Sequence, residues 1–392
     1  MLLDTMNVVS FCHVLQGPAA TQYLGDMGAN IIKVEPLAGE RGRRWAGAEM
    51  DGLSGLYFSA FRNKRLIAID LKSDEGREIV FSLIEKADVV VENFRHGVMA
   101  RLGLSYEDIR RRKPDIIYAS GTGWGGKGPM LSRESQDLII QARTGLAAAT
   151  GTQLKEARAV GSAVVDQHGG ALLALGILGA YVRKLATGKG MLVESSLFAA
   201  GFDLQTEPLT VFMSSRPGAN VLNRDSHLAT WYHHAPYGIY PLLDGEMALS
   251  TNPIRKLAEA LNSDDLRSLK DAHPYKDRDK IAKAVARELE QRRFSDVAPK
   301  FDAEGIWYGK VQNFDDVSED PQAKAMDIFQ EVEVDGHKVT LVNHPIRYDG
   351  QTPKVRIAGS VVGQHTREIL KENGYSDEQI DDLFTRKVIA GL

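Results

Sequence analysis

The residues that could do chemistry gather around Asp166, which follows the apolar residues Ala163-Val164-Val165 and precedes an apolar stretch from Ala171 to Ala186. The apolar pattern predicts a helix over 171–186, so Asp166 lies where that helix begins. Unpaired backbone N–H groups at a helix N-terminus favour an ionised carboxylate. Asp166 is therefore either a helix N-cap, the commoner role of such an acid, or a reactive carboxylate.

Two further features accompany this acid. The pair Gly169-Gly170 has no side chains, so we expect another molecule to approach the backbone closely there. Asp137 opens a second predicted helix, over 138–149. Its position favours a capping role, and a role in the site is the alternative.

Several other kinds of site are disfavoured. The glycine-rich stretch 121–128 lacks the Ser or Thr and the smooth helix start of a phosphate-binding P-loop, so we interpret it as a loop beside a ligand. His233-His234 has no partner at metal-ligand spacing, and we predict no metal site. No Gly-x-Ser-x-Gly elbow occurs, and Cys12 lies in an apolar run typical of packing.

The composition is that of a globular protein of 392 residues, 43% of them apolar and 26% charged. A net charge of -4 argues against a nucleic-acid partner. A single cysteine excludes an internal disulfide and favours a cytoplasmic location. We identify no signal peptide and expect no segment long and apolar enough to span a membrane.

The order of the elements that must position these residues predicts an α/β fold with a parallel sheet. Helical stretches alternate with five strand-like runs. These runs cover residues 7–11, 30–34, 66–71, 88–94 and 115–120. Ligands of such sheets bind beyond the carboxyl ends of the strands, so the loops that follow these runs are where we expect a site.

The composition and the predicted elements of the chain change after residue 215. The stretch 214–220 has the composition of a linker, a hairpin is predicted around Asp244-Gly245, and 252–300 is helical and charged. We predict a large domain of residues 1–215 and 330–392 and a smaller α+β domain of 216–329.

Many short motifs are distributed nearly from end to end of the chain. They are Val14-Leu15-Gln16-Gly17-Pro18, residues 28–35, Asn63-Lys64-Arg65, Asp70-Leu71-Lys72, Glu92-Asn93-Phe94-Arg95, Arg101-Leu102-Gly103, residues 161–170 and residues 362–366. Together these motifs resemble those of the class III CoA-transferases of the CaiB/BaiF type.

The resemblance implies that Asp166 is a nucleophile. It would attack an acyl-CoA thioester to give an acyl–aspartyl anhydride, and CoA thiolate would then form an aspartyl-CoA thioester that the acceptor acid resolves. Water must be excluded because both intermediates hydrolyse. Gly169 and Gly170 would let the acyl carbonyl meet backbone N–H donors.

The resemblance also implies a site for coenzyme A. Its members would contact the adenine, the phosphates or the pantetheine arm. They are Val14, Leu15, Gln16, Ile69, Lys72, Asn93, Phe94, Arg95, Val98, Arg101 and Leu197. Pro36 replaces a basic residue of the family, and we expect Arg41, Arg43 or Arg44 to bind the phosphate instead.

The family fold implies a Rossmann-like large domain and a small domain joined into a ring, with two rings interlocked as a homodimer. The partners would be an acyl-CoA and a small carboxylic acid.

One alternative function is that of an enzyme similar to α-methylacyl-CoA racemase, which transfers a proton at the carbon beside the thioester. Its His–Asp pair corresponds here to Gln136-Asp137, and a glutamine amide cannot exchange a proton near pH 7. A non-catalytic CoA-binding protein or an oxidoreductase is the other.

Overall fold

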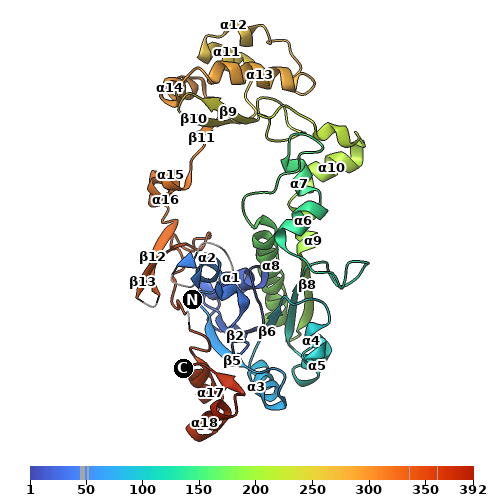
Figure 1. The fold of residues 1–392 in the computed structure, drawn as a ribbon, viewed down its shortest axis with the longest axis vertical. Helices are drawn as coiled ribbons and strands as arrows, with labels where there is room; N and C mark the ends of the chain where they lie inside the picture. The colour runs from blue at the N-terminus through green and yellow to red at the C-terminus, as the bar shows by residue number, and fades with distance from the viewer. Residues whose placement is uncertain (45–48, 51–52, 335, 360) are drawn as a thin grey trace. The chain divides into compact units, whose positions relative to one another are not determined.

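The computed structural model, drawn as a ribbon in Figure 1, describes residues 1–44, 49–50, 53–334, 336–359 and 361–392, and its chain forms two compact units. Unit 1 comprises Met1–Ile140, Ala163–Leu204 and Pro321–Leu392, and unit 2 comprises Gln141–Ser162 and Gln205–Asp320. The division into a large domain of 1–215 with 330–392 and a small domain of 216–329 stays a prediction.

Unit 1 is built on a seven-stranded sheet in the order β14-β5-β2-β1-β6-β7-β8. The strands are β1 Asn7–Ser10, β2 Asn30–Glu35, β5 Arg65–Ile69, β6 Val89–Glu92, β7 Ile117–Thr122, β8 Met191–Ser196 and β14 Ile389–Ala390. Neighbours pair in parallel from β5 to β8, and β14 pairs antiparallel with β5. The predicted parallel α/β sheet is confirmed.

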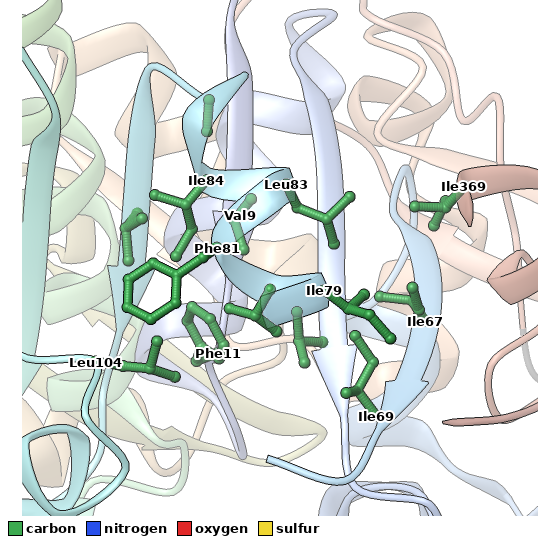
Figure 2. Packing of buried hydrophobic residues seen from close by; sticks show 14 of the residues in the cluster. Val9, Phe11, Ile67, Ile69, Ile79, Phe81, Leu83, Ile84, Leu104 and Ile369 are labelled. Atoms are coloured by element: carbon green, nitrogen blue, oxygen red, sulfur yellow. The ribbon is translucent and has the colours of Figure 1, made fainter. Parts of the chain in front are cut away.

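Helices cover both faces of this sheet because its strand residues alternate between two buried clusters. Val8 packs with α1 (Gln16–Asp26) and α8 (Val164–Thr187) on one face. Val9 packs on the other face, where Figure 2 shows Ile79, Phe81, Leu83 and Ile84 of one helix against the strands. The helices of that face are α3 Asp74–Glu85, α4 Val98–Arg101, α5 Tyr106–Arg112, α17 Thr366–Glu372 and α18 Asp377–Thr385.

Unit 1 also holds shorter elements. They are the 3-10 helix η1 Arg41–Arg44, the strands β3 Glu49–Met50, β4 Leu53–Ser54, β12 Phe329–Val334 and β13 His337–Val342, and the helices α2 Gly55–Ala60, α9 Leu197–Asp203 and α16 Pro321–Ala325. Helix α6, Asp137–Arg143, begins in unit 1 and ends in unit 2.

Unit 2 has its own buried core, in which helices pack on the antiparallel sheet β11-β10-β9. Its strands are β9 Gly238–Leu242, β10 Gly245–Leu249 and β11 Tyr308–Lys310. Its helices are α7 Leu146–Thr150, α10 Thr206–Ser215, η2 Ala219–Leu222, α11 Ile254–Leu261, α12 Asp264–Arg267, α13 Arg278–Leu289, α14 Phe294–Glu304 and α15 Phe314–Glu319. The predicted hairpin at Asp244-Gly245 is the β9–β10 turn.

Two predicted helices differ from the structure. The helix predicted over 138–149 is divided into α6 and α7, because Gly145 takes a left-handed conformation with φ of 85°. The helix predicted over 171–186 begins earlier, at Val164, so that Asp166 lies inside its first turn.

Helix α8 corrects a further expectation. It is long and apolar enough, by length and composition, to cross a membrane, whereas the sequence pattern predicts no such segment. The core helix of an α/β domain meets the same criterion. Its residues Leu173, Ala174 and Ile177 are buried with the sheet and α1.

Candidate active site

The loop between β1 and α1 is held in an unusual conformation. Val14 has a φ of 59°, which a β-branched residue rarely adopts. The amide of Asn93, just after β6, fixes this loop: Asn93 Oδ1 accepts from the His13 backbone N–H at 2.8 Å, and Asn93 Nδ2 donates to the His13 carbonyl at 2.9 Å. Asn93, predicted to contact CoA, therefore positions the loop that carries Gln16.

A cavity of about 530 Å³ lies at the carboxyl ends of β1, β2, β6 and β7, where the sequence predicts a ligand. It brings together several residues that were singled out from far-apart motifs. These are Val14, Leu15, Gln16, Asn93, Phe94, Asp166 and Leu197. Gly121, within β7, and Gly123, just after β7, line it as well.

Asp166 is not the N-cap of α8. Ala163 occupies that position and makes no side-chain cap bond. The cap comes from another helix: Asp137 Oδ1, at the start of α6, accepts from the backbone N–H groups of Val165 at 2.7 Å and Asp166 at 3.1 Å. Asp137 therefore occupies the helix terminus, and no side-chain hydrogen bond of Asp166 is found in the described part of the chain.

The surroundings of Asp166 oppose its ionisation. Burial raises the pKa of the Asp166 carboxyl to about 7, and the neighbouring Asp137 charge adds to the increase. The expectation that the helix terminus favours an ionised Asp166 is thus wrong, because Asp137 takes up the N–H groups. A half-buried carboxyl with a perturbed pKa on a cavity wall has the properties of a functional group.

Comparison with known proteins identifies the family. Residues 3–366 match the sequence model of CoA-transferase family III. The chain belongs to this family. A human protein, succinyl-CoA:glutarate CoA-transferase, is 30% identical over 99% of this chain and 90% of its own length. The succinyl-CoA:mesaconate CoA-transferase of Haloarcula hispanica is 30% identical over 95% of this chain and 96% of its own.

The fold comparison agrees with this family. A CAIB/BAIF family protein from Brucella suis superposes with a TM-score of 0.81 and 26% sequence identity, covering 94% of this chain and 98% of the other. The family and the enzyme class predicted from the sequence, a class III CoA-transferase, are confirmed.

The glycine pair of this family III enzyme has a different role from the one expected. A Cβ at Gly170 would lie 2.8 Å from both the Ala19 Cβ and the Gln16 carbonyl oxygen, which belong to α1. Gly169 and Gly170 are buried inside α8, where their N–H groups serve the helix. These glycines let α8 pack closely against α1 and do not expose N–H donors to an acyl group.

The other predicted CoA contacts lie outside this cavity. The Ile69 side chain is 1% exposed in the core, whereas Lys72 and Arg101 are exposed and Val98 is half-buried. Arg95 lines an adjoining cavity of about 280 Å³, and its Nη1 pairs with Glu134 Oε1 at 2.6 Å. Their contacts with CoA stay predictions.

The structure distinguishes the three arginines that could bind phosphate in place of a basic residue at position 36. Arg43 is buried, donates to Glu35 at 2.8 Å and stacks on Tyr57. Arg44 is exposed and does not line the cavity. Arg41 lines the cavity beside Pro36, and its side chain has no partner among the described residues.

His13 is a cavity residue that sequence reasoning missed. It lines both cavities, its ring stacks on Phe94 at 4.9 Å, and burial lowers its pKa to about 4. The imidazole is therefore neutral at pH 7. Its place directly before the Val14-Leu15-Gln16 motif was the available signal.

Proposed function

We propose that this enzyme moves CoA from an acyl-CoA to a free carboxylic acid through covalent intermediates on Asp166. The carboxylate attacks the thioester carbon, the C–S bond breaks, and an acyl–aspartyl anhydride and CoA thiolate form. The thiolate then attacks Cγ of Asp166 and releases the first acid. The acceptor carboxylate reverses both steps, so the energy of the thioester is conserved.

One observation carries this proposal: the Asp166 carboxyl lies on the wall of the cavity without a side-chain partner in the described structure. A carboxylate that is poorly solvated and free of donors is a stronger nucleophile than one in water. Since its pKa is about 7, a large fraction is ionised at neutral pH. Asp137 holds the first turn of α8 and thereby the Asp166 backbone.

The order of the strands supports a direction for the bound CoA. Pro36 and Arg41 follow β2, and Gly121 lies in β7, three positions along the sheet. Neighbouring strands are about 4.8 Å apart, so these ends of the cavity are separated by roughly 14 Å. The thioester would lie near Asp166, and Arg41 would meet the phosphates at the other end.

The activities named for two relatives suggest the substrate class. One acts on succinyl-CoA and glutarate and the other on succinyl-CoA and mesaconate, which are dicarboxylic compounds. We propose that this enzyme exchanges CoA between C4 and C5 dicarboxylates. Formate and oxalate as the best donor and acceptor pair would contradict this assignment.

The decisive experiment traps the intermediate. After incubation with succinyl-CoA, hydroxylamine should convert Asp166 into a hydroxamate that peptide mass spectrometry locates. Asp166→Asn should lower transfer by about 10⁴-fold and keep CoA binding. Asp203→Asn, in a carboxylate of α9 that does not line the cavity, is the matched control. Full transfer by Asp166→Asn, or an adduct elsewhere, would overturn the proposal.

The racemase alternative has a separate readout. It predicts that a chiral 2-methylacyl-CoA in deuterated water takes up α-deuterium without an acceptor acid. The transferase predicts no uptake and strict dependence on the acceptor.

We also propose the family's assembly, two ring-shaped chains of large and small domains interlocked as a homodimer. The outer surface of α8 supports association, since Leu175, Val182 and Leu185 are 65%, 67% and 70% exposed. Apolar side chains grouped on one helix are typical of an interface. Sedimentation should give a dimer of 43.1 kDa chains.

We further propose a cytoplasmic location and no nucleic-acid or membrane partner, which the single cysteine and the negative charge favour.

A further inference from the structure

The Gln16 amide is a buried hydrogen-bond donor that the protein leaves unused. Gln16 is the first residue of α1 and is 2% exposed. Its Nε2 has no hydrogen-bond partner in the described part of the chain. Because an unpaired buried donor is destabilising, its retention calls for a partner that arrives with the substrate.

The space around this amide is shaped by two glycines. A Cβ at Gly121 of β7 would lie 3.1 Å from Gln16 Oε1, and a Cβ at Gly169 of α8 would lie 3.2 Å from Gln16 Nε2. A side chain at either position would press on the amide. Residues from two elements thus leave room for the Gln16 side chain.

The amide shares its cavity with the reactive carboxyl. Gln16 and Asp166 both line the cavity at the carboxyl ends of the strands. Gly169, against which the Gln16 Nε2 lies, follows Asp166 by three residues. Positions three residues apart lie on the same face of a helix, so Nε2 and the Asp166 side chain are on one side of α8.

We propose that Gln16 is a catalytic residue whose Nε2–H donates to the Asp166 carbonyl oxygen while that carboxyl carries an acyl group or CoA. The inference rests on the proposed function of Asp166. It gives Gln16 a role in the reaction itself, beyond the contact with CoA that the sequence predicted.

The donor would act in the step that loads CoA onto Asp166. The thiolate sulfur bonds to Cγ of the anhydride, and the C=O electron pair moves onto the oxygen, which becomes negative. Collapse re-forms the C=O bond and breaks the C–O bond to the acyl group, which leaves as a carboxylate. A fixed N–H donor that meets the oxygen as its charge develops lowers this barrier.

The test compares Gln16→Met with Gln167→Met, an exposed glutamine one residue beyond Asp166. Gln16→Met keeps the length of the side chain and removes the donor. We expect a loss in kcat of about 10²-fold with KM values for acyl-CoA and acceptor changed less than about threefold. The midpoint temperature of thermal unfolding should not fall, because the variant removes an unpaired polar group. Gln167→Met should behave as the wild type.

A second variant guards against misfolding. Gln16→Leu also removes the donor and fills much of the same space with apolar atoms, so it should show the same loss in kcat. A kcat within threefold of the wild type in a folded variant, or a rise in KM alone, would overturn the role of Gln16. An Asp166 adduct on the wild type separates this failure from that of the proposed function, because without the adduct the proposed function itself fails.

Discussion

Two aspartates of unit 1, the buried Asp26 and the half-buried Asp166, have opposite surroundings. Asp26, at the end of α1, accepts from Arg62 Nη2 at 2.7 Å and from Asn63 Nδ2 at 2.7 Å, and His344 Nδ1 lies 3.6 Å away. Burial raises the pKa of Asp26, but His344, Arg62 and Asn63 together lower it below its usual value. Asp166 has no such donors among the residues that the structure describes, and burial and Asp137 raise its pKa to about 7.

The contrast distinguishes a carboxylate that stabilises the fold from one that can react. A buried carboxylate with a full set of donors is fixed in one state and joins parts of the fold. A carboxyl without donors beside a second acid changes its charge near neutral pH and can react. The same contrast holds for cations, since Arg43 is bonded to Glu35 and Arg41 is not bonded among the described residues.

The largest expected effect on stability comes from Asp26→Asn. The change keeps the shape but leaves the buried Arg62 guanidinium without its counter-charge, so we expect a loss of about 3–5 kcal/mol in the free energy of unfolding. Urea unfolding at pH 7 measures it. Asp74→Asn, in a carboxylate that is 95% exposed, should unfold at the wild-type urea concentration. Equal stability of both variants would show that the Asp26 charge does not stabilise the fold.

Asp166→Asn should have the opposite effect on stability and raise the free energy of unfolding. Because the folded pKa of Asp166 is raised, its ionisation destabilises the native state increasingly between about pH 4 and pH 7 and fully above that. A pKa raised from 3.8 to about 7 corresponds to about 4 kcal/mol, so we expect the variant to be more stable than the wild type by up to that amount at pH 8 and nearly equal to it at pH 4. Chemical denaturation at both pH values tests this. A variant less stable at pH 8 would mean that Asp166 has a structural partner.

The arginines extend the comparison to ligand binding. Arg41→Ala should raise the KM for acyl-CoA by about tenfold and leave kcat nearly unchanged, because the variant cannot bind a phosphate far from the thioester. Arg44→Ala is the exposed control and should alter neither constant. The effect of Arg41→Ala should fall for a substrate with the pantetheine arm but without the nucleotide. An equal effect on both substrates would contradict a phosphate contact.

The smallest expected effect comes from Asp137→Asn. Its Oδ1 can still accept the two N–H bonds at α8, but the negative charge beside Asp166 is removed. Since burial is the main cause of the raised pKa, the midpoint at which kcat/KM rises with pH should move from near 7 to lower pH by about half a unit to one unit. An unchanged midpoint would show that Asp137 acts only as a cap.

Much of unit 1 could be predicted from local patterns. Short continuous apolar runs such as Val89–Val91 and Ile117–Ala119 are typical of buried strands, whereas helices show a period of about 3.6 residues. These runs predicted the strands of the sheet. The loops at the strand ends were predicted from topology alone. Leu15, Phe94 and Leu197 of the cavity were predicted only from the family resemblance, since no local pattern joins them.

The errors share a physical origin in contacts between distant segments. The local sequence suggests that Asp166 caps its own helix, but Asp137 reaches the terminus from another helix. Gly169-Gly170 looks like an opening for a ligand, but α1 fills the space. The choice among Arg41, Arg43 and Arg44 depends on Glu35 and Tyr57, which only the folded chain brings to Arg43.

The pairing of β14 with β5 has a consequence for protein synthesis. β5 obtains its outer neighbour from Ile389–Ala390, more than 300 residues later in the sequence, so the backbone groups of that edge remain unpaired until these two residues have been synthesised. Ile369 and Leu370 of α17 also arrive late to cover the apolar surface beside it. Until then a nascent chain exposes an unpaired sheet edge, and we expect its yield in cells to depend on chaperones that bind such edges.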